Sequence, residues 1–313
     1  MKRANKKGIE MTFNWIFAIL AGGFILFLAI YGASKLIRTG EQTVYTETAA
    51  TLTSLFDPLE TGLASGKASE ISFKKKSKVY FTCQELYEPF GRHTISFTEQ
   101  TFGDTYGEKG QEISVKDKYI FSENVIEGKT FYYFTKPYFM SYKVADLLMM
   151  YSDEQVFCLY NAPEDVQDTL EGLNLKNIYF PNSTTSCQGT RVCFAGGRNC
   201  DITVANDYVL KQGKKLYYTD DLLYAAVFSS PEMYECNIQR IKKRFDSLGS
   251  IYLEKIKILE RENCQPTLGS ELSIAIGTNI QSSKDLLILF EQIDNFDSIN
   301  QRAKDGCKLY YNT

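Results

Sequence analysis

Few residues of this chain are of a type and spacing that could do chemistry. His93 is its only histidine, which excludes a histidine cluster for a metal and leaves at most one Ser-His or Cys-His pair. Because it directly follows Gly91-Arg92, we interpret it as a surface turn residue. Adjacent acids such as Asp220-Asp221 point in different directions, and we expect this pair to cap the following helix.

A nucleotide site is not predicted. Gly128-Lys129-Thr130 resembles the end of a phosphate-binding loop, but Glu123 stands where that loop needs its first glycine. A strand pattern follows where a helix should hold the phosphate, and the chain has no G-x-G-x-x-G motif. We therefore predict no cofactor, no metal and no catalytic residue. A pair of catalytic carboxylates remains open, because its members are close in space and their spacing in sequence does not reveal them.

The cysteines favour disulfides over a metal site. The spacing between Cys187, Cys193 and Cys200 lacks the C-x2-C knuckles typical of zinc. An even number of cysteines, all on one side of an apolar segment, is typical of an oxidising compartment. The disulfide candidates are Cys83, Cys158, Cys187, Cys193, Cys200, Cys236, Cys264 and Cys307.

The apolar segment is predicted to cross a membrane. Residues 11–34 contain no Asp, Glu, Lys, Arg or His. As a helix they would span about 36 Å, against a hydrocarbon core of about 30 Å. Trp15 and Tyr31 lie near the two ends, where aromatic rings prefer the interface. A cleaved secretory signal is the alternative, but its apolar part would be shorter.

Charge predicts the orientation of this span. Lys2, Arg3, Lys6 and Lys7 precede it, and the more basic flank stays in the cytoplasm. The rest of the chain then lies outside, with 31 basic residues (35 less those four) against 37 acidic ones (38 less Glu10). This net charge of −6 argues against nucleic acid as a partner. The predicted partners are the lipid bilayer and proteins at the cell surface, or other copies of the chain.

We expect an α+β chain: a transmembrane helix, a β-rich region, a βαβ-containing α/β region and a C-terminal helical hairpin or bundle. A cytoplasmic tail (1–10) precedes the membrane helix (11–34), and a helical stalk (35–68) that ends at Pro58, Gly62 and Gly66 follows it. The extracytoplasmic domain (69–313) divides into β-rich (69–142), α/β (143–228) and helical (229–313) regions.

Local patterns place several elements. Val156–Tyr160 and Ile178–Phe180 read as strands joined by a helix that Pro163 opens and Gly172 closes. Residues 211–215 are typical of a hairpin turn. The lysine-rich run 74–78 is interpreted as a solvated sheet edge.

The last third carries clear helix starts. Ser229-Ser230-Pro231-Glu232 opens a long amphipathic helix that ends near Cys264, and Ser282–Asp285 opens another. The face of the long helix that carries Arg240, Lys242, Lys243 and Arg244 is expected to be solvated.

Helix length limits the disulfides that this region can form. Cys236 and Cys264 would lie about 42 Å apart on one helix, too far to pair. If residues 267–276 form a return helix, Cys307 meets Cys264; if they do not, it meets Cys236. We favour Cys264–Cys307.

Two resemblances add to these patterns. The blocks at 119–148 and 222–241, including Tyr119-Ile-Phe-Ser and Ser229-Ser-Pro-Glu-Met-Tyr, look like a group of archaeal membrane-anchored proteins of uncharacterised activity. Lys6-Lys7-Gly8 before an apolar helix resembles the processing site of type IV pilin-like precursors, which implies cleavage between Gly8 and Ile9. In those families the acidic residue usually lies five after the cut, whereas Glu10 is the second here.

The sequence therefore favours a non-enzymatic, membrane-anchored cell-surface protein that is a structural or interaction module of the envelope. Asn182 of the triplet Asn182-Ser183-Thr184 is a glycosylation candidate. Small residues spaced by four in the span, Ala18 with Gly22 and Ala29 with Ala33, would allow self-association. The alternatives are a pilin-like filament or secretion-apparatus subunit and a surface hydrolase with paired carboxylates.

Overall fold

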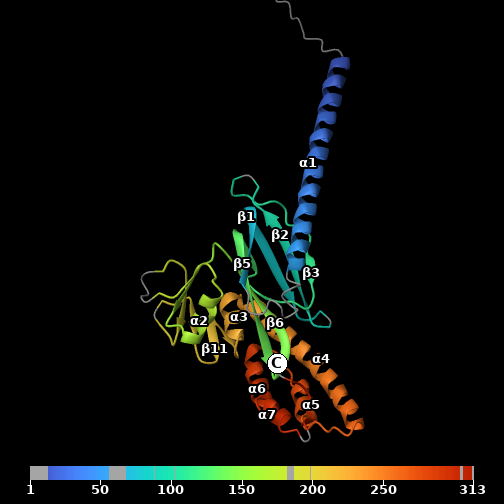
Figure 1. Ribbon diagram of the computed structural model, residues 1–313. Helices are drawn as coiled ribbons and strands as arrows, with labels where there is room; N and C mark the ends of the chain where they lie inside the picture. The colour runs from blue at the N-terminus through green and yellow to red at the C-terminus, as the bar shows by residue number, and fades with distance from the viewer. Residues whose placement is uncertain are drawn as a thin grey trace, which may run out of the picture.

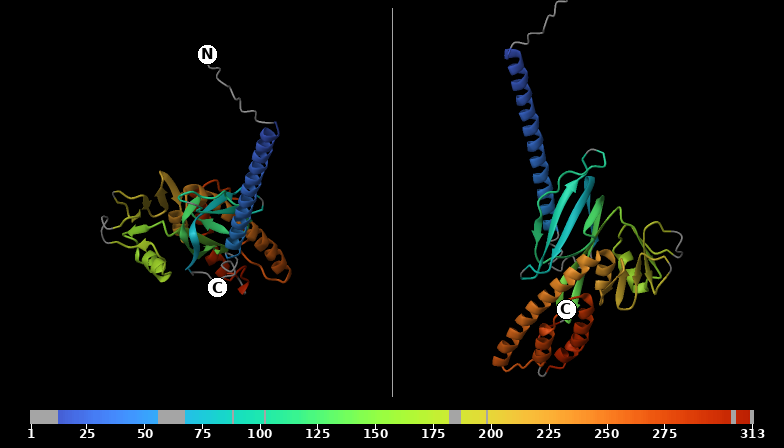
Figure 2. Two further views of the ribbon diagram at one scale, coloured as in Figure 1. Left: turned by 90° about the horizontal axis from the view of Figure 1, so that it is seen from above. Right: turned by 180° about the vertical axis from the view of Figure 1, so that it is seen from behind.

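The fold is α+β, as expected, and begins with one long helix (Figure 1). The structure, a computed structural model, describes residues 13–55, 68–87, 89–101, 103–181, 187–197, 199–303 and 306–311. Helix α1 runs without a break from Phe13 to Leu55. Among the described residues it is the one helix long and apolar enough to cross a membrane. The first half projects from the rest of the molecule, and the C-terminal helices lie at the opposite end (Figures 1 and 2).

Several predicted features fall outside the described residues. These are the basic tail, the processing site at Gly8, Ile9 and Glu10, the glycosylation candidate Asn182, and the stalk end at Pro58, Gly62 and Gly66.

The first sheet has six strands in the order β3-β2-β1-β5-β6-β4. All neighbours are antiparallel except β4 and β6, which are parallel. It continues through Ser152, beyond the boundary at residue 142 expected for the β-rich region. The strands are β1 (Ala68–Gln84), β2 (Arg92–Glu99), β3 (Ile113–Val115), β4 (Tyr119–Phe121), β5 (Val125–Met140) and β6 (Tyr142–Ser152).

This sheet is buried on both faces. Because side chains alternate across a strand, Phe131 and Tyr133 of β5 face a core that includes α1, while Tyr132 and Phe134 face a second core with the C-terminal helices. The sheet therefore separates α1 from the rest of the domain.

The second sheet has the order β12-β11-β10-β9-β7-β8. Strand β7 pairs in parallel with both β8 and β9, and β9 pairs in parallel with β10. Helix α2 (Glu164–Gly172) connects β7 to β8, which confirms the predicted strand-helix-strand unit. A hairpin joins β11 to β12 through Gln212 and Gly213, both with positive φ. The strands are β7 (Phe157–Tyr160), β8 (Ile178–Tyr179), β9 (Thr190–Phe194), β10 (Ile202–Val204), β11 (Tyr208–Lys211) and β12 (Lys214–Tyr217).

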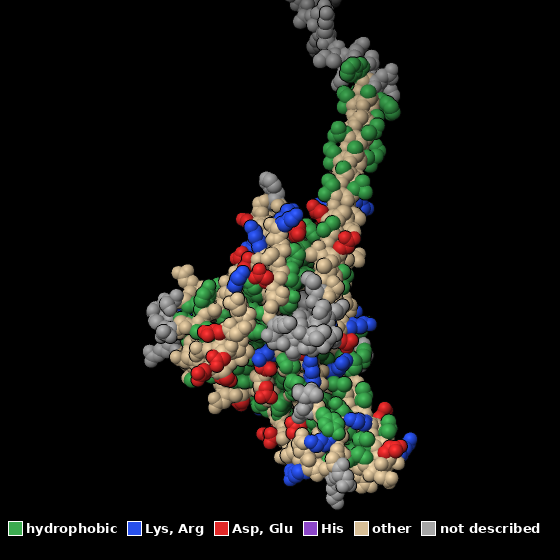
Figure 3. Space-filling model, viewed as in Figure 1, with side chains coloured by type: hydrophobic (Ala, Val, Ile, Leu, Met, Phe, Trp, Pro, Cys, Tyr) green, Lys and Arg blue, Asp and Glu red, His purple; other side chains and the backbone are tan. Residues whose placement is uncertain are grey.

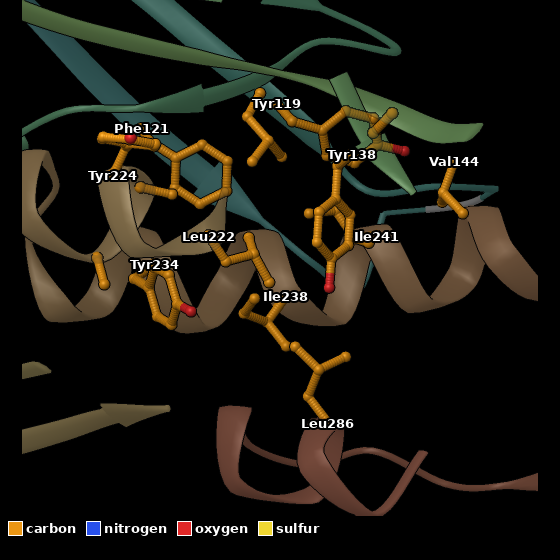
Figure 4. Close-up of a cluster of buried hydrophobic side chains, with 14 of the residues drawn as sticks. Tyr119, Phe121, Tyr138, Val144, Leu222, Tyr224, Tyr234, Ile238, Ile241 and Leu286 are labelled. Carbon is orange, nitrogen blue, oxygen red and sulfur yellow. The ribbon is translucent and has the colours of Figure 1, made fainter. Parts of the chain in front are cut away.

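The C-terminal helices follow the predicted starts. Helix α4 (Pro231–Arg261) has Ser230 as its N-cap, whose hydroxyl accepts a hydrogen bond from the Met233 amide. A capping box of Ser282 and Asp285 opens α6 (Ser283–Ile293). The other helices are α3 (Leu222–Phe228), α5 (Gly269–Gly277) and α7 (Phe296–Gln301). Side chains of the first sheet meet those of α3, α4 and α6 in the main core (Figure 4).

Two charged features differ from the expectation. The basic face of α4 is only partly solvated: Arg240 is fully buried and Lys242 is 5% exposed, whereas Lys243 and Arg244 are partly exposed. Asp221 stands at the N-cap of α3 without a capping side-chain hydrogen bond and instead forms an ion pair with Lys136 at 3.3 Å. Arg240 hydrogen-bonds to the distant carbonyls of Phe90 and Lys118 instead of to solvent. Asp221 pairs with the distant Lys136 instead of capping its own helix.

The lysine-rich run is also not at a sheet edge. Strand β1 lies between β2 and β5, although Lys74 and Lys75 are exposed where its register with β5 shifts. Lys76 and Lys78 form ion pairs with Glu127. Gly128-Lys129-Thr130 lies inside β5, so its likeness to a phosphate loop is accidental.

Candidate functional site

The cysteines form four disulfides. Cys264–Cys307 is the pairing favoured from the sequence, and α5 is the return helix on which it depends. Cys158–Cys187 and Cys193–Cys200 stabilise the second sheet and the loops around it. Cys83–Cys236 joins β1 to α4 across 153 residues of sequence. Four disulfides are typical of a protein that folds in an oxidising compartment.

The second half of α1 belongs to the domain instead of forming a free stalk. Tyr45, Ala49 and Leu52 are buried in the core on the α1 face of the first sheet. The Tyr45 ring lies edge-on to Phe97, with 6.0 Å between centroids. Because the helix is continuous, the domain is held rigidly to the apolar half of α1.

Polar contacts fix the same junction. The Gln42 amide donates to Glu108 at 3.0 Å, and Arg38 approaches the same carboxylate at 3.4 Å. The Gln111 backbone amide donates to the Thr46 hydroxyl at 3.0 Å. Segment 107–111 therefore binds the side of α1.

Gly110 allows this close approach, which yields a prediction. A Cβ at Gly110 would lie 3.0 Å from the backbone nitrogen of Thr46, which cannot move without bending α1. We expect Gly110→Ala to lower the free energy of unfolding by about 1–3 kcal/mol, the usual cost of overpacking. Gly277→Ala is the control, because nothing lies within 4 Å of its Cβ. Equal thermal stability of the two variants would contradict this account of the junction.

A buried polar network joins α4 to the first sheet. His93 is fully buried on β2, not in a surface turn, and its Nε2 lies 2.8 Å from Oδ1 of Asn237. The Asn237 amide donates to the Ile120 carbonyl, which turns Oδ1 toward His93 and Arg240. The acceptor Oδ1 at 2.8 Å favours a proton on Nε2, while the Ile120 backbone amide approaches the same nitrogen at the longer distance of 3.4 Å. His93 has a structural role here, and the sequence lacked any sign of its distant partner Asn237.

The network predicts a dependence of stability on pH. Burial, and then the charge of Arg240, hold the pKa of His93 well below its ordinary value, so the folded chain keeps the ring neutral. The unfolded chain takes up a proton near pH 6.5, and stability therefore falls as the pH drops below about 6.5, by up to about 1.4 kcal/mol per unit.

His93→Gln isolates this term, because the chain has one histidine. The free energy of unfolding of the wild type should fall relative to that of His93→Gln between pH 7 and pH 5. Parallel curves for the two proteins over this range would show that the ring is not buried in its neutral form.

A groove at the second sheet is the candidate binding site. One cavity of about 740 Å³ lies where the parallel strands end: Asn161, Ala195 and Ala205 each line it and each directly follow a strand, namely β7, β9 and β10. In open α/β sheets, ligands bind at this carboxyl-terminal edge. Asn161 and Ala195 have φ of 54° and 61°, so the chain turns sharply as it leaves two of the strands.

Carboxylates and tyrosines give this cavity its chemistry. Burial raises the pKa of Asp221, although the nearby Lys136 opposes the shift. Burial also raises the pKa of Tyr224; a hydrogen bond with Thr169 opposes this shift, and the charges of Asp221 and Asp165 add to it. Two carboxylates therefore lie near one phenol inside the cavity. Among the described residues, no group of three or more His, Cys, Asp or Glu side chains could hold a metal ion.

Sequence reasoning named Asp220 and Asp221 only as caps of the following helix, and it did not predict the groove. Its lining comes from α2, from strand ends and loops of the second sheet, from the segment before α3 and from α3 itself, so these residues are scattered along the sequence. None of the disulfide cysteines lines this cavity.

Comparison with known proteins gives no relative. No family model, no curated protein and no solved structure matches this chain.

Proposed function

We propose that this chain is a single-span membrane protein of the cell envelope and that its C-terminal domain, held outside the cytoplasm, is a structural or interaction module. The observation that carries the proposal is α1, which has an apolar first half exposed on all sides and a second half with one face, that of Tyr45, Ala49 and Leu52, buried in the domain core. Exposed Leu, Ile and Phe side chains along the first half would be costly in water and are favourable in lipid. The four disulfides support placement outside the cytoplasm.

Alkaline carbonate extraction of membranes tests the anchor. The wild-type chain should stay in the membrane pellet, and Ile25→Lys should be released in part, because a lysine at mid-span costs about 3 kcal/mol of insertion. Val44→Lys is the matched control: Val44 is also exposed but lies beyond the span, and this variant should stay in the pellet. A wild-type chain found in the supernatant would overturn the proposal.

A pilin-like filament subunit is the second candidate. The apolar half of α1 that would contact lipid could instead pack against the same segment of neighbouring copies. Mass spectrometry of the native N-terminus separates the two candidates, because processing would leave a chain that begins at Ile9. An intact Met1 excludes the filament candidate.

A hydrolase with paired carboxylates is less well supported than a binding module. The cavity holds Asp165 and Asp221, but Asp221 is engaged by Lys136 within the protein. Binding in the groove needs only the charges and shape of its lining, so the structural or interaction role is the one we propose.

A further inference from the structure

The groove extends beyond the first cavity. A second cavity, also of about 740 Å³, shares Asn206, Tyr218 and Asp220 with the first. The two cavities therefore lie side by side, and we call them together the acidic groove; their lining runs from the carboxyl ends of the parallel strands to α6 and α7. Each half alone is as large as a typical small-molecule pocket, so the whole suits an extended ligand.

The charge of the acidic groove is of one sign. None of its described lining residues is Lys or Arg. In the view of Figure 3, acidic side chains gather around α2, whereas the helical end carries side chains of both signs. Its aspartates come from separate places in the fold: Asp165, Asp207, Asp220, Asp221, Asp294 and Asp297.

Most of this charge is not compensated within the domain. Lys136 forms an ion pair with Asp221, and the Tyr310 hydroxyl donates to Asp297. Among the described residues, the carboxylates of Asp165, Asp207 and Asp294 form no ion pair, and neither does that of Asp220. A groove lined in this way favours a cationic occupant and repels an anionic one.

The helix at the groove does not reverse this preference. Helix α2 directs its positive N-terminal end toward the first cavity, where Pro163 and Asp165 line the wall. Glu164 and Asp165 occupy its first turn and offset that partial charge. Binding of a phosphate group at this helix N-terminus is therefore disfavoured.

Aromatic side chains complete a surface suited to lysine and arginine. Tyr218 lines both cavities, and Phe139 and Phe290 line the second. Aromatic faces attract cations and pack against the methylene stems of long basic side chains.

We infer that the acidic groove binds a basic peptide segment of another protein, with its Lys or Arg side chains directed to the aspartates. This inference rests on the proposed role as an interaction module and names the chemistry of its partner. The extended shape favours a peptide over a single small amine, and the sign of the charge excludes an acidic partner.

The test uses the full chain in lipid nanodiscs and fluorescent pentalysine as the probe. We expect saturable binding at low salt that weakens steeply between 50 and 200 mM salt. The double variant Asp220→Asn/Asp294→Asn should bind about tenfold more weakly, because it removes two uncompensated charges. Asn at position 220 tolerates the φ of 46° found there, so the fold should persist.

Three controls decide the result. Glu254→Gln/Glu260→Gln removes two exposed acids of α4 that do not line either cavity, and it should bind pentalysine as the wild type does. Pentaglutamine should not bind, and lysine amide should bind far more weakly than pentalysine.

Each opposite outcome contradicts the inference. Absence of pentalysine binding by the wild type, equal losses in the two double variants, or lysine amide binding as tightly as pentalysine would overturn it. Stable incorporation of the chain into nanodiscs tests the membrane anchor separately. A chain that enters nanodiscs but does not bind pentalysine would contradict the inferred partner and leave the proposed anchor intact.

Discussion

Replacing both Cys83 and Cys236 with alanine is expected to lower the free energy of unfolding by about 5 kcal/mol. The disulfide closes a loop across 153 residues of sequence, and the entropy that it removes from the unfolded chain grows with loop length. It also joins β1 to α4 beside Asn237, on which the buried network depends. Guanidinium unfolding of the full chain in detergent, followed by circular dichroism, measures the loss.

A disulfide that closes a much shorter loop in the same chain is the control for this effect of loop length. Cys193 and Cys200 are seven residues apart, so the same entropy argument gives only about 2 kcal/mol for their double alanine variant. If the two double variants unfold at the same denaturant concentration, the long crosslink does not constrain the domain in the way described here.

The second large effect is expected for Arg240→Met, at about 4 kcal/mol of lost stability. The buried guanidinium donates to the Phe90 carbonyl at 3.0 Å, to the Lys118 carbonyl at 2.8 Å and to Asn237 Oδ1 at 2.9 Å. Methionine fills much of the volume but leaves these acceptors without their donor, and unsatisfied polar groups of this kind each cost about 1–3 kcal/mol.

Arg261→Met is the matched control on the same helix. Arg261 is exposed in the last turn of α4, so its loss should cost no more than about 0.5 kcal/mol. A loss of stability for Arg240→Met as small as that for Arg261→Met would mean that the guanidinium does not join α4 to the sheet.

Local features of the sequence were sufficient for much of the fold. Ser230 with Pro231 and Ser282 with Asp285 start helices through contacts within one turn, so their neighbours in sequence contain the whole physical cause. Helix length excluded Cys236–Cys264, and the return helix expected over residues 267–276 favoured Cys264–Cys307 over Cys236–Cys307.

Features that depend on distant partners could not be predicted. Arg240 looks like part of a basic solvent face until the carbonyls of Phe90 and Lys118 are placed around it. The same holds for Cys83–Cys236, and for the acidic groove, whose aspartates come together only when both sheets and α6 are assembled. Hydrophobic patterns with a period of two or 3.6 residues indicate the face of a strand or helix on which a side chain lies, but not the residues that it contacts.

Labelling of intact cells with a membrane-impermeant amine reagent, read by mass spectrometry of the peptides, tests the membrane topology most directly. Lys74 and Lys75 are exposed on the domain, whereas Lys2, Lys6 and Lys7 precede the span. We predict that Lys74 and Lys75 react in intact cells and that the three tail lysines react only after lysis. Reaction of the tail lysines in intact cells, with Lys74 and Lys75 protected until lysis, would contradict the account.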